Sequence, residues 1–262
     1  MFSRTVPFSR RAEKASSHQK LVRAARRVIN PHLPADIAFP TAAKIIHFEG
    51  KNGPDGLLDK RSVTDEPIDH INLKDPSDRT LFNQVENHIY NLHDALKKKN
   101  TVRAEFEAAW LEHLVVDGLT PAHHQPSKER PETDTHVEEH KTNIGAAADV
   151  LKLYWKYLGP SGGGIHHLMF EAGVEAIVMP LSPQSLAKIK IPAEDLEKVK
   201  SGQFIKLYEA SVRKIDSYKM FQRYEKSSWT TELAHDVREV LIPEAVRMVS
   251  LAWLAAVYRK KQ

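Results

Sequence analysis

The stretch DRTLFNQVENHIYNLHDALKK, residues 78–98, decides the fold class. Its apolar residues recur every three or four positions, which places them on one face of an α-helix and predicts a helix over 78–98. The apolar stripe consists of Leu81, Phe82, Val85, Ile89, Leu92 and Leu96. Asn100 interrupts the pattern, and a second helix is expected from Thr101 to Val116. Gly118 and Pro121 are expected to stop it.

The remainder of the chain also has helical periodicity, and strand signals are weak throughout. Helices are expected over 16–29, 141–158, 165–178, in short pieces up to about 222, and over 230–260 with a kink or boundary at Pro243. Residues 32–76 are rich in Pro and Gly and are predicted to form a long loop. The fold class is therefore all-α. We expect a flexible basic terminus over 1–15, then one helical domain over 16–262 with an exposed polar insertion near 124–140.

Composition limits the chemistry that the chain can perform. Its 262 residues include 14 His and no Cys. Disulfides, thiolate zinc sites and cysteine nucleophiles are therefore excluded. Any metal ion must be held by His, Asp or Glu.

The charge distribution and the longest apolar run bear on partners and location. Residues 1–27 contain eight Lys or Arg and one Glu, a net charge of +7 against +4 for the whole chain, so the rest carries −3. This basic segment could make weak contact with an anionic surface, although a solvated terminus is the more common explanation of such a segment. The run Met248–Tyr258 is about half the length of a membrane span and is predicted to be a buried core helix, so no transmembrane segment is expected. No signal peptide is visible; a cytoplasmic location is the default, with secretion or an organelle left open.

The stretch AAWLEHLVVDGLTPAHH, residues 108–124, carries the most chemical information. His113 and Asp117 are four residues apart and share one helix face. Gly118 and Pro121 then turn the chain and return His123 toward the same point. A His–Asp pair alone is more often a surface ion pair, but the added Pro and His favour a site for a divalent ion.

This pattern, His-x3-Asp-x3-Pro-x-His, resembles the signature of the zinc-dependent phospholipase C and S1/P1 nuclease superfamily, whose fold is all-α. The family usually has Gly before the Asp and Gln before the Pro, where this chain has Val116 and Thr120. These departures are typical of a distant member and leave the substrate open.

The resemblance implies further metal ligands at positions that match the family pattern. A second His-x3-Glu pair is present as His167 and Glu171, with His166 as a neighbouring alternative. Upstream, Asp55 precedes His70 by the family interval, and His18 opens a helix before them. The competing residues are Asp36, Asp59 and Asp69 for the Asp, and His32 and His47 for the early His.

The same resemblance implies a cluster of two or three zinc ions. Asp55, His70 and His113 would bind one ion, and His123, His167 and Glu171 a second. His18 with Asp117 would bind any third. Asp117 would bridge two ions, and Asp55 and Asp117 are the implied catalytic carboxylates. A metal-bound water acidified to hydroxide would attack phosphorus. The family's N-terminal Trp ligand has no counterpart before His18, so we expect an altered third site.

The predicted function is hydrolysis of a phosphoric ester, with a phospholipase C-like substrate preferred. One alternative is a single-strand nuclease or nucleotidase of the same superfamily, acting on nucleotides or nucleic acid. Another is an HD-type phosphohydrolase using the doublets His93-Asp94 and His235-Asp236. A last alternative is a helical protein that binds metal without catalysis.

Overall fold

The computed structural model describes residues 16–49, 70–124 and 163–260, and all the regular structure within these ranges is helical. The expected all-α class is confirmed for this part of the chain. The basic terminus over 1–15, most of the polar insertion and the expected helix over 141–158 lie outside the described residues.

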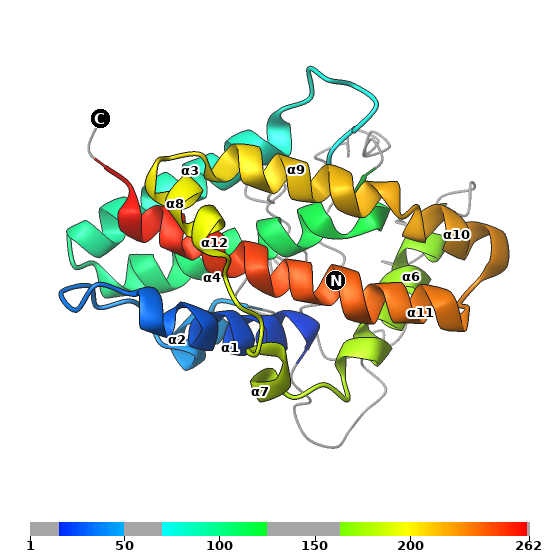
Figure 1. The fold of residues 1–262 in the computed structure, drawn as a ribbon, viewed down its shortest axis with the longest axis horizontal. Helices are drawn as coiled ribbons and strands as arrows, with labels where there is room; N and C mark the ends of the chain where they lie inside the picture. The colour runs from blue at the N-terminus through cyan, green and yellow to red at the C-terminus, as the bar shows by residue number, and fades with distance from the viewer. Residues whose placement is uncertain (1–15, 50–69, 125–162, 261–262) are drawn as a thin grey trace, which may run out of the picture.

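Figure 1 shows how the helices of the described residues are arranged. Their bounds are α1 Ser17–Ile29, the 3₁₀ turn η1 Asn30–His32, α2 Ala42–His47, α3 Thr80–Lys97, α4 Thr101–Leu119, the 3₁₀ turn η5 Pro121–His123, α6 Gly163–Val178, α7 Pro183–Leu186, α8 Ala193–Lys200, α9 Phe204–Ser217, α10 Met220–Ser227, α11 Thr231–Asp236, the π-helical segment η6 Val237–Leu241 and α12 Ile242–Tyr258.

Helix α12 is the central core helix of the described fold. It contacts α1, α3, α4, α8 and α9, and it crosses the middle of the molecule in Figure 1. Its residues 248–256 are buried, as the sequence predicts. The continuous helix Thr231–Tyr258 is long and apolar enough to cross a membrane, but 78% of its most apolar window is buried inside the protein. The indole of Trp253 fixes α12 to α4 by donating a hydrogen bond of 2.9 Å to the carbonyl of Ala108.

Helices α3 and α4 form an antiparallel pair that packs on α12. The predicted stripe of α3 is buried, apart from Leu96, which is half-buried against the core. The pair is joined at Lys99, which has a positive φ of 53°, and at Asn100. The Asn100 side chain accepts a hydrogen bond from the backbone N–H of Arg103 and so caps α4.

Two expectations about element bounds need correction. The expected loop over 32–76 contains the short helix α2, which begins where the Thr41 side chain accepts a hydrogen bond from the N–H of Lys44. Helix α4 continues through Gly118 to Leu119. Gly118 does not end the helix; it makes room for close packing, because a Cβ there would lie 2.2 Å from Tyr208 Oη and 2.5 Å from Leu81 Cδ2.

The helix does not end at Pro243; the backbone hydrogen-bond pattern changes just before it, from a π-helical segment to an α-helix. Pro243 lies in the first turn of α12 and has no N–H to donate to a carbonyl one turn earlier. The five residues before α12 adopt π-helical hydrogen bonding, so α11, η6 and α12 run on as one long helix.

Candidate metal centre

The centre is built on α4, which places His113 and Asp117 on one buried face. The Nε2 atom of His113 lies 3.1 Å from Oδ2 of Asp117. Both side chains are buried deep in the protein. The four-residue spacing therefore brings the two groups together, as the sequence predicts.

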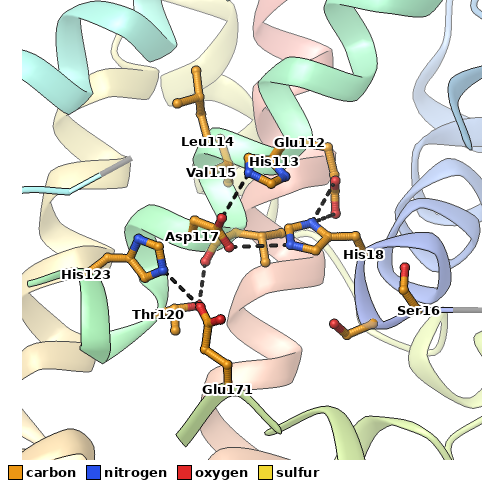
Figure 2. A network of polar contacts seen from close by, with 12 residues as sticks. Ser16, His18, Glu112, His113, Leu114, Val115, Asp117, Thr120, His123 and Glu171 are labelled. Atoms are coloured by element: carbon orange, nitrogen blue, oxygen red, sulfur yellow. Dashed lines mark hydrogen bonds and ion pairs between the residues drawn. The ribbon is translucent and has the colours of Figure 1, made fainter. Parts of the chain in front are cut away.

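Helix α1 supplies His18 to the same carboxylate. Its Nε2 atom lies 3.4 Å from Oδ1 of Asp117, and its Nδ1 atom lies 3.1 and 3.3 Å from the two oxygens of Glu112. The imidazole rings of His18 and His113 stack with centroids 4.7 Å apart and planes inclined by 17°. Each oxygen of Asp117 thus faces one imidazole, and Figure 2 shows this carboxylate between the two rings.

Helix α1 is held in place by α6. Glu175 of α6 accepts a hydrogen bond of 2.9 Å from the backbone N–H of Ser17, at the first residue of α1. An anion at a helix N-terminus is favoured by the helix dipole. One turn later, Lys20 donates to three carbonyl oxygens at the end of α6, those of Val178, Met179 and Leu181. These contacts fix the position from which His18 enters the site.

The turn η5 brings His123 back toward Asp117. The hydroxyl of Thr120 donates to the carbonyl of Val116, and the ring of His124 makes a hydrogen bond of 3.0 Å to the carbonyl of Gly118. With the turn fixed in this way, Nε2 of His123 lies 3.0 Å from Oε1 of Glu171 on α6.

Helix α6 contributes its own His–Glu pair. Nε2 of His167 lies 3.2 Å from the same oxygen of Glu171 that His123 contacts. The neighbouring His166 is exposed; its Nδ1 lies 3.9 Å from Glu225, and its ring meets that of Tyr224 edge-on, with centroids 6.4 Å apart. Of the two adjacent histidines, His167 is therefore the one whose side chain points into the site.

His70 joins this second group through a backbone contact. The N–H of Ile71 donates a hydrogen bond of 2.9 Å to the carbonyl of His123, which ties the segment before α3 to the turn. The ring of His70 then lies 4.4 Å from that of His123 and 5.6 Å from that of His167, between centroids.

Two adjacent clusters result. We call His18, Glu112, His113 and Asp117 the Asp117 cluster, and His70, His123, His167 and Glu171 the Glu171 cluster. Ligand atoms lie within 4.8 Å of one another in His18–His113–Asp117, in His70–His123–His167 and in Asp117–His123–Glu171. The last group joins the two clusters.

The structure thus brings together all the predicted ligands that lie within the described residues: His18, His70, His113, Asp117, His123, His167 and Glu171. Asp55 lies outside the described residues, as do its rivals Asp59 and Asp69. The implied division between ions stays a prediction. In the structure His70 is tied to His123, and His113 lies with His18 and Asp117.

Two buried carboxylates were not predicted from the sequence. Glu112 faces His18, and an oxygen of Glu49 lies 4.0 Å from Nδ1 of His113. Both side chains are fully buried. A signal for Glu112 exists in the sequence, since it is an acidic residue inside the otherwise apolar run between Ala108 and Val116. Glu49 follows a short helix, and no periodicity marks it.

The electrostatics of the two clusters follow from burial and opposite charge. Burial alone lowers the pKa of His18, but Glu112 and Asp117 raise it well above the usual 6.5. Burial alone raises the pKa values of Asp117 and Glu171, but the positive charges and hydrogen-bond donors around them, including the neighbouring histidines, hold both well below their usual range. Burial lowers the pKa of His167, against the effect of its hydrogen bond to Glu171.

These residues fit a divalent cation. Four buried carboxylates converge here, and with the described residues they form ion pairs only to histidines. Buried charges in proteins are usually paired or coordinate metal ions. Imidazole nitrogens together with carboxylate oxygens are the donor set that zinc accepts.

The HD doublets lie apart from this centre. His93 makes a hydrogen bond to the carbonyl of Ala256, and Asp94 pairs with Lys98 on the surface. Asp236 pairs with Arg223, and its neighbour His235 is exposed. Within the described residues neither doublet belongs to a group of potential metal ligands.

No protein-family model, no curated protein and no solved structure gives a significant match to this chain. What the centre can do is therefore argued from its own geometry and from the motif residues.

Proposed function

We propose that the chain is a metal-dependent phosphoric-ester hydrolase of the phospholipase C type, with two or three zinc ions. The observation that supports this most directly is that the predicted metal ligands lie close together in space. Seven His, Asp and Glu residues from five separate segments meet in one buried centre, at the positions that the motif resemblance implies.

The residues that would hold the ions follow from the two clusters. His18, His113 and Asp117 would hold one ion. A second would be held by Glu171 with His123 and His167, which both contact its Oε1, and His70 groups with these two histidines. Bound divalent ions would supply an acidified water at neutral pH and would neutralise charge on phosphoryl oxygens. No protein nucleophile is then needed, in agreement with the absence of cysteine.

The chain's own residues would orient and anchor the reaction. Asp117 presents one oxygen to each stacked imidazole and so sets the spacing of the Asp117 cluster. Glu171 presents one oxygen to both His123 and His167. Burial of the Asp117 side excludes bulk water, whereas the partly exposed His167 gives a phosphate ester a side from which to approach.

The test is reconstitution. Protein stripped with a chelator is reloaded with zinc and assayed with bis(p-nitrophenyl) phosphate, short-chain phosphatidylcholine and single-stranded DNA. We expect two or three tightly bound ions and zinc-dependent diester hydrolysis, with the phospholipid preferred. Preference for DNA would favour the nuclease alternative, bound zinc without hydrolysis would favour the non-catalytic one, and no restorable zinc would contradict the proposal.

A further inference from the structure

We propose that Glu112 is a positioning residue, whose carboxylate binds the Nδ1 side of His18 and so directs Nε2 of that ring toward Asp117. This inference rests on the proposed metal site and names a residue that the motif does not contain. It concerns the interior of α4, one residue before His113.

The contact is close, two-sided and buried. Both oxygens of Glu112 approach Nδ1 of His18, at 3.1 and 3.3 Å, and both side chains have no solvent exposure. Burying a carboxylate on an apolar helix is costly unless it is bound by a partner. The partner that the described residues provide for Glu112 is His18.

The arrangement gives the ring one orientation, with Nδ1 toward Glu112 and Nε2 toward Asp117. A neutral imidazole has one N–H donor and one acceptor nitrogen. A cation beside Nε2 would bind the lone pair of that nitrogen, and the proton would then be on Nδ1, which would donate it to the carboxylate of Glu112. Stacking against His113 restrains rotation of the ring.

A carboxylate that holds the far nitrogen of a ligating histidine is a recurrent means of raising metal affinity, and its loss typically costs about 10–100-fold. Geometry distinguishes this role from direct ligation. Glu112 lies on the opposite side of the His18 ring from Asp117, so one ion cannot take both Nε2 of His18 and Glu112. Ligand atoms of His18, Glu49 and Glu112 also lie within 4.8 Å of one another, so direct ligation by Glu112 would have to use that separate group.

Helix α4 also contains a matched control. Glu107 is equally buried, five residues earlier, and one of its oxygens lies 2.5 Å from Nδ1 of His88 on α3. Like Glu112 it is a buried carboxylate against a histidine Nδ1, although its other oxygen also pairs with Arg103, at 2.5 Å. His88 belongs to no potential ligand group among the described residues. A general effect of removing a buried charge from α4 should therefore appear in both variants.

The experiment measures zinc affinity by chelator competition, and zinc stoichiometry, in the full-length wild-type, Glu112→Gln and Glu107→Gln proteins. We expect Glu112→Gln to weaken one zinc about 10–100-fold without changing the stoichiometry at saturation, and Glu107→Gln to leave affinity unchanged. Equal affinities in all three proteins, or equal losses in both variants, would overturn the inference. So would loss of one whole equivalent in Glu112→Gln, because Glu112 would then be a ligand. If the wild-type protein bound no zinc, the result would instead contradict the proposed function itself.

A second measurement does not depend on whether the variant folds. In zinc-loaded wild-type protein labelled with ¹⁵N-histidine, the His18 ring should show a protonated, hydrogen-bonded Nδ1 and a metal-bound Nε2. A metal-bound Nδ1 on His18 would overturn the inference.

Discussion

The Asp117 cluster and the Glu171 cluster use the same two residue types and differ in burial. In the Asp117 cluster the side chains of His18 and Glu112 are 0% exposed, and those of His113 and Asp117 only 2% and 4%. In the Glu171 cluster the side chains of His123 and Glu171 are also largely buried, 5% and 10% exposed, but that of His167 is 26% exposed and His70 is half-buried. One cluster is closed by core helices, and the other reaches solvent at His167. If the proposed function holds, we expect the first to fix the centre and the second to meet the substrate.

The two clusters also differ in how their histidines are supported. In the Asp117 cluster His18 is bound at both ring nitrogens by buried carboxylates, and its ring is stacked on another ring. In the Glu171 cluster two histidines share a single oxygen of Glu171. We therefore expect an ion in the Asp117 cluster to be held more rigidly than an ion in the Glu171 cluster.

The largest effect is expected from Asp117→Asn, because both rings of the buried cluster contact this carboxylate. Loss of an outer-shell partner alone costs about 10–100-fold, so kcat/KM for a phosphodiester should fall by more than about 100-fold. The measurement is steady-state hydrolysis at saturating zinc.

The control for this variant is Asp94→Asn, which alters a surface pair with Lys98. It should leave kcat/KM unchanged. The reverse pattern, with Asp94 essential and Asp117 dispensable, would contradict the assignment and favour the HD alternative.

Gly118→Ala tests the scaffold between the two clusters. Its Cβ would meet Tyr208 Oη at 2.2 Å and Leu81 Cδ2 at 2.5 Å, so either α4 or these two side chains must shift. We expect the free energy of unfolding to fall by about 3 kcal/mol, as for overpacked cores, measured by urea denaturation. Gly202→Ala provides the comparison: its φ is +79° but nothing lies within 4 Å, so it should cost only about 1 kcal/mol. If both substitutions lowered the free energy of unfolding equally, the packing of Tyr208 and Leu81 against position 118 would not be as close as the structure indicates.

A chelator should remove zinc from the two clusters at different rates. Because His167 is partly exposed and the Asp117 cluster is not, a chelator should extract zinc in two phases, about tenfold or more apart in rate. His167→Ala should abolish the fast phase alone. A single phase in the wild-type protein, or loss of the slow phase in this variant, would contradict the difference in accessibility.

The smallest expected effect is on the free energy of unfolding, and it comes from the contact of Asp216 with His124, the residue that follows the turn η5. The close contact with His124, whose Nδ1 lies 3.6 Å from Oδ1 of Asp216, lowers the pKa of Asp216 to about 2 against the opposing effect of burial, with Lys219 as a further partner. A depressed pKa stabilises the fold above the unfolded value of 3.8, and the contribution is lost as the pH falls from about 4 to 2. Since Asp216 is partly exposed, Asp216→Asn should cost about 1 kcal/mol at pH 5, and the difference from wild type should vanish near pH 2. A difference that stays constant with pH would contradict this role.

The sequence predicts the parts of the fold that depend on local periodicity. The apolar stripe of α3 and the buried run in α12 follow from spacing, and the change in backbone hydrogen bonding before Pro243 follows from the missing N–H of proline. The role of Gly118 could not be predicted in the same way, because it depends on Tyr208, 90 residues away in sequence. The residues of the short helix α2 are surrounded by proline and glycine, which conceals its periodicity.

The candidate site was predictable where its ligands share a helix. His113 with Asp117, and His167 with Glu171, lie one turn apart and face the same way. The partition between clusters was not predictable, because a backbone hydrogen bond from Ile71 to His123 decides it. Glu49 was missed because its place beside His113 depends on the packing of α2 against α4.

The most direct test of the central claim is anomalous diffraction at the zinc absorption edge from crystals of the zinc-loaded protein. The account predicts strong peaks within bonding distance of His18, His113 and Asp117, and of His123, His167 and Glu171. Peaks confined to exposed histidines such as His166 and His235, with none in the two clusters, would contradict it.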